Sequence, residues 1–179
     1  MKIKIMRGVI YLLIALSLVA VFNRQTVNVS YAKGLLNVAA PSIAAPQWLN
    51  STPLDNKALT GKVYLVEFWT FGCYNCRNVE PYVKSWYAKY HSQGFEVIAV
   101  HTPEFAHEAR IENVKNYLKK NTINYPVAID NDFTIWNRFA NRYWPAMYLI
   151  DKKGMLRYYH FGEGEYKATE AMIQSLLKE

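Results

Sequence analysis

Hydrophobic positions along this chain follow two patterns: continuous apolar runs and stretches with helical spacing. The continuous runs are short and rich in β-branched and aromatic residues, which predicts buried strands. They cover residues 62–69, 95–101, 125–129, 146–150 and 155–161. The last two runs are separated by Asp151-Lys152-Lys153-Gly154, which predicts a tight antiparallel hairpin.

Helical spacing appears between these runs. Over residues 73–91 the apolar positions recur every three or four residues, with Pro81 among them, which predicts a helix with a kink. Thr102-Pro103-Glu104 has the form of a helix start, and helical spacing continues beyond it.

Two further helices complete the pattern. Asp132 can cap a short helix that runs to Phe139, and residues 166–177 form an amphipathic helix at the end. The order β-α-β-α-β-α-β-β-α predicts an α/β fold. Its central mixed sheet would have parallel strands, an antiparallel C-terminal hairpin at one edge, and helices on both faces.

The chain begins with a pattern typical of an export signal. Residues 1–7 carry three cations, and residues 8–22 are fifteen residues without charge. As a helix the apolar segment would span roughly 22 Å, less than the roughly 30 Å hydrocarbon core of a bilayer. The small-residue site Ser30-Tyr31-Ala32 lies ten residues further on, which is far for cleavage. A cleaved signal peptide and an uncleaved membrane anchor, both within residues 1–32, therefore stay open.

Both interpretations place the rest of the chain outside the cytoplasm, in the periplasm or cell envelope, because basic residues stay on the inner side. If the segment is uncleaved, residues 8–22 would anchor the protein to the inner membrane. Residues 33–47 are rich in Ala, Pro, Ser and Asn without periodicity and predict a linker. Residues 48–179 form the predicted folded domain.

Charge and composition narrow the function. The formal net charge is +7, but residues 1–32 hold four cations and no acid, which leaves 17 basic and 14 acidic residues in the remainder. That balance is ordinary, so nucleic-acid binding is set aside. The two cysteines exclude a disulfide-rich miniprotein and a four-cysteine zinc site.

The chemistry centres on Cys73-Tyr74-Asn75-Cys76, between a predicted buried strand and a helix. A thiolate at the helix N-terminus is favoured by unpaired N–H groups and the macrodipole, so Cys73 should be the nucleophile. Cys76 lies one helical turn further on and could release the mixed disulfide. A haem site would need His in place of Arg77, and a zinc ribbon would need a second cysteine pair. A static structural disulfide remains as an alternative.

The residues around this motif carry a family resemblance. VEFWTFGCYNC, VHTPEF, YPVAIDND, YWPAMYLID and HFGEGEY are similar to segments of thioredoxin-like thiol–disulfide oxidoreductases. The chain most resembles the thioredoxin-like domain of the DipZ branch, and more distantly the membrane-tethered TlpA and ResA branches. The resemblance covers about residues 48–177 and implies a thioredoxin fold with extra elements.

The resemblance also implies roles for single residues. It implies that Pro145 is a cis-proline facing the dithiol and that the backbone of Trp144 receives an incoming strand of substrate. An acid in the matching strand of such proteins shuttles the proton of the second cysteine, which assigns this role to Glu67. Burial of Glu67 inside an apolar strand should raise its pKa. Alternatively, this position faces solvent or a lysine.

Other residues are weaker candidates. His101 and Glu104 follow a parallel strand at the same sheet edge as the dithiol, and His101 could tune Cys73 or contact substrate. Asp130-Asn131-Asp132 resembles a fragment of a calcium loop but is better interpreted as a turn and helix cap. Thr70-x-x-Cys73 is similar to part of a peroxidase motif, but the expected proline is Val66 here.

Aromatic residues near the motif complete the predicted site. Tyr74, Trp69 and Trp144 could form an apolar platform for docking partners, or could simply pack. The prediction is an exported protein-disulfide oxidoreductase that needs no cofactor and no metal. It would act as a reductase on disulfide-bearing envelope proteins, because the membrane-tethered relatives mostly reduce their substrates. A separate transmembrane thiol transporter would supply the electrons. A thiol peroxidase and a non-catalytic envelope binding module are the alternatives.

Overall fold

The computed structural model describes residues 36–179. The predictions of an export signal or a membrane anchor fall on residues outside this range. Among the helices of the described residues, none has both the length and the apolar character needed to cross a membrane.

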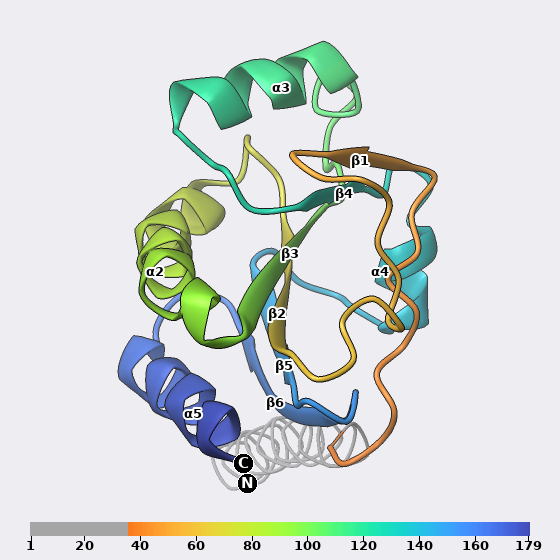
Figure 1. The fold of residues 1–179 in the computed structure, drawn as a ribbon. Helices are drawn as coiled ribbons and strands as arrows, with labels where there is room; N and C mark the ends of the chain where they lie inside the picture. Colours follow the sequence, from red (N-terminus) through yellow and green to blue (C-terminus); the bar gives the residue numbers. More distant parts are fainter. Residues whose placement is uncertain (1–35) are drawn as a thin grey trace, which may run out of the picture. The chain divides into compact units, whose positions relative to one another are not determined.

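A six-stranded mixed sheet forms the centre of the described region, with the strand order β1-β4-β3-β2-β5-β6 (Figure 1). β2, β3 and β4 are parallel, whereas β1, β5 and β6 each run antiparallel to the neighbour that they join. The strands are β1 (Gln47–Leu49), β2 (Val63–Trp69), β3 (Phe95–His101), β4 (Val127–Ile129), β5 (Ala146–Ile150) and β6 (Leu156–Phe161). This confirms the predicted α/β fold and its C-terminal hairpin.

Helices cover both faces of the sheet. α2 and α5 lie on one side and α4 on the other (Figure 1). Buried residues of α3 join the same core cluster as those of α2 and α5, so these three helices cover one face. The helices are α2 (Tyr74–Tyr90), α3 (Ile111–Lys120), α4 (Thr134–Arg138) and α5 (Tyr166–Lys178), with a 3₁₀ turn, η1 (His91–Gln93), after α2.

The buried position of β2 and β3 explains their continuous apolar sequence. Every residue of both strands is buried, because each strand has a neighbour on both sides and protein on both faces. Alternate residues of β2 point to opposite faces. Val63, Leu65 and Trp69 belong to the core cluster beneath α2, so Glu67 points to that face as well.

The prediction of a linker over residues 33–47 is wrong from residue 37 onward, because these residues pack against the folded domain. Main-chain hydrogen bonds join Asn37 to Leu156 and Ala40 to Gly154, and the side chain of Ile43 is fully buried. Residues 47–49 then form the edge strand β1 against β4. Such pairing uses backbone groups, so it leaves no periodicity in the sequence.

The helix start predicted at Thr102-Pro103-Glu104 is also wrong, because α3 begins at Ile111. Residues 102–110 form a loop instead. The carboxylate of Glu108 accepts hydrogen bonds from the backbone N–H groups of Glu104 and Phe105, and so it closes a turn in place of a helix.

Candidate functional site

The two cysteines lie at the start of α2 and form a disulfide with Cα atoms 5.3 Å apart. Cys73 is the N-cap residue, with extended backbone, and its Sγ accepts a hydrogen bond from the N–H of Cys76 at 3.1 Å. Cys73 is half-buried, whereas Cys76 is only 2% exposed. The more accessible sulfur is therefore the one at the helix N-terminus, which suits attack by Cys73 and resolution by Cys76.

The turn before the helix follows directly from the end of β2. The N–H of Cys73 donates to the carbonyl of Thr70, and the N–H of Arg77 donates to the carbonyl of Cys73. The first turn of α2 contains no acidic side chain. The positive end of the helix dipole is therefore left to favour an anion at Cys73, which is a thiolate once the disulfide is reduced.

Glu67 lies in the middle of β2 and is 3% exposed. Its neighbours in the sheet are Ala99 of β3 and Met147 of β5, which are both apolar. Burial, followed by the charge of Glu80, raises the pKa of Glu67 from 4.5 to about 8. The carboxyl group is thus buried on the sheet face that carries Cys76. The alternative, in which Glu67 faces solvent, does not hold.

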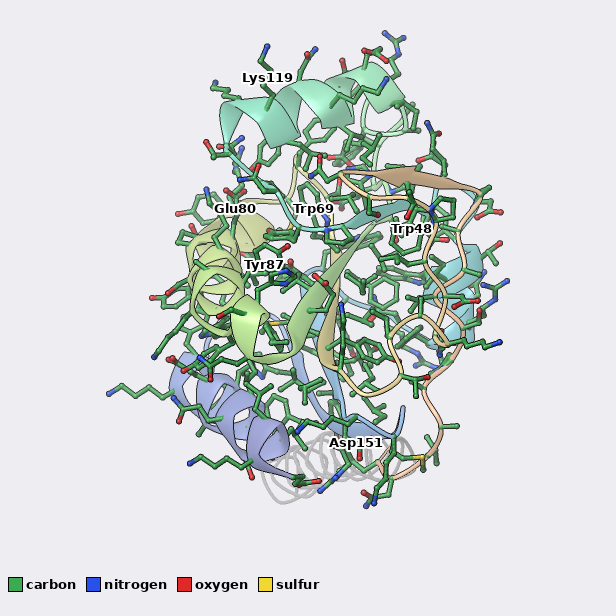
Figure 2. All side chains as sticks on the ribbon, in the orientation of Figure 1. Trp48, Trp69, Glu80, Tyr87, Lys119 and Asp151 are labelled. Carbon is green, nitrogen blue, oxygen red and sulfur yellow. A yellow bond between two sulfur atoms is a disulfide. The ribbon has the colours of Figure 1, made fainter. Side chains whose placement is uncertain are left out.

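Glu80 of α2 and Tyr117 of α3 interact electrostatically with this buried acid. Glu80 projects from α2, and its Oε2 accepts a hydrogen bond from the hydroxyl of Tyr117 at 2.8 Å; Figure 2 labels Glu80. Lys84 lies 3.5 Å from the other carboxylate oxygen of Glu80. Burial raises the pKa of Tyr125, and the charges of Glu67 and Glu80 add to the effect. Glu67 and Glu80 therefore act on each other as like charges, and both act on Tyr125.

The residues before β5 lie at the edge of the sheet where β2 ends and the disulfide begins, because β5 runs antiparallel to β2. The peptide bond between Trp144 and Pro145 is cis, and Pro145 is buried. The indole N–H of Trp144 donates to the carbonyl of Thr102 at 3.0 Å. Trp144 and Cys73 both pack against the core cluster that contains Cys76.

The three predicted platform residues differ in exposure. Tyr74 is 68% exposed between the two cysteines, and Trp144 is partly buried. Trp69 is only 5% exposed at the end of β2 (Figure 2), with its ring 5.1 Å from that of His101. Trp69 is therefore a core residue and offers no surface to a partner. Sequence reasoning missed two exposed aromatic residues at the same edge, Phe105 and Tyr143.

His101 is fully buried at the end of β3. Its Nε2 lies 3.2 Å from the hydroxyl of Thr70, and its Nδ1 has no hydrogen-bond partner among the described residues. Burial lowers the pKa of His101 to about 4, although the charge of Glu108 acts in the opposite direction. His101 is therefore neutral at physiological pH, and its burial rules out direct contact with substrate in this conformation. The Glu104 side chain is exposed to solvent.

The Asp130-Asn131-Asp132 segment is a helix cap, as predicted. Asp130 accepts hydrogen bonds from the N–H groups of Ile135 and Trp136, and Asp132 accepts one from the N–H of Thr134. Both carboxylates are thus committed to the first turn of α4.

A Cys-x-x-Cys disulfide at the start of the helix after a central strand, on this mixed sheet, defines the class of thioredoxin-like thiol–disulfide oxidoreductases. The solved structure of the thioredoxin-like superfamily protein SPOA0173 matches with a TM-score of 0.74 at 31% identity, over 79% of this chain and 97% of that one. The chain belongs to the AhpC/TSA family, whose model matches residues 36–159.

Named relatives support this class. Protein DipZ of Mycobacterium bovis is 45% identical over 135 residues, which are 74% of this chain but only 19% of DipZ. The thiol-disulfide oxidoreductase YkuV of Bacillus subtilis is 30% identical and is covered over 88% of its length by 74% of this chain. The thiol-disulfide oxidoreductase ResA of Bacillus cereus is 32% identical, over 72% of this chain and 71% of ResA. The predicted resemblance is confirmed.

Proposed function

We propose that this protein is an exported disulfide reductase that acts on disulfide-bearing proteins of the cell envelope. The observation that carries the proposal is the position of Cys73, which is the partly exposed N-cap of α2 and is bonded to the buried Cys76. In the reduced protein the thiolate of Cys73 attacks a partner disulfide. This forms a mixed disulfide and releases one partner sulfur as a thiolate.

Cys76 completes the exchange. Its thiol gives up a proton and attacks the Sγ of Cys73, which releases the second partner sulfur and leaves the Cys73–Cys76 disulfide. Two electrons have then passed to the partner. Glu67 is the proposed acceptor of the proton in the fraction of molecules in which it is ionised, because its pKa of about 8 is close to the ordinary pKa of a thiol, about 8.5. A separate transmembrane thiol transporter would return the oxidised protein to its dithiol form.

Three exposed aromatic side chains support a docking role for the surface around the disulfide. Tyr74 follows β2, Phe105 follows β3, and Tyr143 precedes β5, with exposed fractions of 68%, 58% and 47%. β2 and β3 are parallel and β5 runs antiparallel to β2, so all three positions meet at one edge of the sheet. We propose that they receive an extended partner segment beside the backbone of Trp144 and Pro145.

Trapping tests the exchange chemistry. Cys76→Ser should accumulate mixed disulfides with envelope proteins, whereas the matched variant Cys73→Ser should accumulate none. A Cys73–Cys76 bond that does not exchange with glutathione or partners would indicate a static disulfide and a binding module. Fast formation of a Cys73 sulfenic acid with hydrogen peroxide would favour the peroxidase alternative, although the Thr70 hydroxyl is buried against His101.

The direction and the location need separate measurements. A reduction potential near about −270 mV is expected for a reductant, whereas a value near about −120 mV would indicate an oxidant. Fractionation of cells that express the full chain, with protease added outside, should show the folded domain on the outer side of the inner membrane. The N-terminal residue of the purified protein distinguishes a cleaved signal from an uncleaved anchor.

A further inference from the structure

Glu108 is a buried acid next to the dithiol that the exchange reaction above does not use. It lies in the loop between β3 and α3, and its side chain is fully buried. One carboxylate oxygen, Oε2, accepts hydrogen bonds from the N–H groups of Glu104 and Phe105 at 2.7 and 3.1 Å. The other oxygen, Oε1, has no hydrogen-bond partner among the described residues. The loop backbone therefore holds one oxygen and leaves the other free.

The free oxygen packs against the residue before the nucleophile. A Cβ atom added to Gly72 would overlap Oε1 of Glu108. Gly72 is not among the glycines with positive φ, so the missing side chain makes room for the carboxylate and does not serve a special backbone conformation. The carboxylate of Glu108 therefore contacts the residue that directly precedes Cys73, and consecutive Cα atoms are about 3.8 Å apart.

Among the described residues, no ion pair neutralises the Glu108 side chain. His101 interacts electrostatically with Glu108, but its burial keeps it neutral at physiological pH. Two backbone N–H donors stabilise a buried carboxylate without removing its charge. A negative charge on Glu108 would act on the start of α2 at low effective dielectric.

We propose that Glu108 is a positioning residue that lowers the reduction potential of the Cys73–Cys76 pair and so makes the reduced protein a stronger electron donor. The disulfide is uncharged, whereas the reduced pair carries a thiolate at Cys73. A carboxylate beside that sulfur penalises the reduced form alone and shifts the equilibrium toward the disulfide. This inference rests on the proposed exchange function and gives a structural reason for its direction.

The test is the equilibrium with glutathione, in which the protein dithiol reduces one glutathione disulfide to two glutathione thiols. The full chain is equilibrated over a series of glutathione ratios, and the oxidised fraction is measured by alkylation and mass. Glu108→Gln keeps a carbonyl oxygen for the two N–H donors and removes only the charge. We expect this variant to favour the dithiol about tenfold more than the parent, a shift of about 30 mV toward oxidising potentials.

Glu104→Gln is the matched control, because it removes the same charge from the same loop at an exposed position. We expect it to change the equilibrium less than twofold. Gly72→Ala provides an independent test, since its Cβ must displace the carboxylate, and it should shift the potential in the same direction as Glu108→Gln. The ultraviolet absorbance of the Cys73 thiolate should also appear at lower pH in Glu108→Gln.

The outcomes separate the two proposals. If the parent protein never equilibrates with glutathione, the exchange function fails, and the role of Glu108 falls with it. If the parent equilibrates but Glu108→Gln and Glu104→Gln have equal potentials, only the role of Glu108 is refuted. A Glu108→Gln variant that fails to fold also refutes it, because the proposal requires a group that acts through charge and not through shape.

Discussion

Replacing Glu67 with glutamine should stabilise the oxidised protein at neutral and alkaline pH. The carboxyl group is 3% exposed, and burial, followed by the charge of Glu80, raises its pKa from 4.5 to about 8. Between these two values the folded protein binds more protons than the unfolded chain. Stability therefore falls as the pH rises from about 4.5 to about 8, because the unfolded state gains by ionising first. Glutamine titrates in neither state and removes this penalty.

The size of the effect follows from the shift. The difference between about 8 and 4.5, at about 1.4 kcal/mol per pKa unit, gives a ceiling of about 5 kcal/mol at pH 9. At pH 7 the folded group is still protonated and the unfolded group is ionised, so the expected gain is about 3 kcal/mol. At pH 4.5 the gain should be below about 0.5 kcal/mol, because the folded group is then protonated and the unfolded group is still half protonated.

The assay is urea unfolding of the oxidised parent and of Glu67→Gln at pH 4.5, 7 and 9, followed by tryptophan fluorescence. Glu112→Gln is the control, since its side chain is 75% exposed and should show no comparable trend. The reasoning requires the difference between Glu67→Gln and the parent to grow with pH. A difference that stays flat from pH 4.5 to pH 9 would refute the raised pKa and, with it, the basis for Glu67 as the proton acceptor.

Three further variants test neighbouring parts of the structure. Glu80→Gln removes the like charge near Glu67, so the pH-dependent loss of stability should end at a lower pH and be smaller in the same urea series. Asp130→Ala removes the acceptor of two N–H groups at the start of α4 and should cost about 2–4 kcal/mol of unfolding free energy in urea at pH 7. Tyr74→Ser should leave stability within about 0.5 kcal/mol, because the ring is mostly exposed, but should slow exchange with protein partners in a stopped-flow assay more than exchange with glutathione.

The sequence predicted the parts of the fold that are encoded by side-chain periodicity. β2 and β3 are buried on both faces and α2 and α5 on one, so their patterns indicated the elements directly. The edge strand β1 has three residues, and residues 37–46 pack through backbone hydrogen bonds and the single buried side chain of Ile43. Neither feature repeats along the chain, so neither leaves a pattern.

The site also contains residues that the sequence pattern reveals and residues that only three-dimensional contacts reveal. Cys73, Cys76 and Glu67 were predicted because a cysteine pair and an acid inside an apolar strand are visible in one dimension. Glu108 was not predicted, because the role proposed for it depends on contact with Gly72, which lies 36 positions earlier in the chain. Whether Trp69 docks partners or packs in the core stayed open in the sequence, because a tryptophan beside the motif gives no sign of which way its ring points.

In the proposed role of Glu108, two opposing electrostatic effects act on the Cys73 thiolate and so on the reduction potential of the dithiol. The N-terminus of a helix favours a thiolate by about 0.3–1 kcal/mol, and by about 2 kcal/mol in favourable geometry. A carboxylate near the sulfur, at an effective dielectric of about 20, disfavours the thiolate by Coulomb repulsion. At pH 7 Glu67 is mostly protonated, because its pKa is about 8, so the proposed charge of Glu108 is the one that opposes the helix. Above pH 8 Glu67 ionises as well and adds a second penalty. As the pH rises, the reduced form should then become a still stronger electron donor than a dithiol that has no buried acids near it.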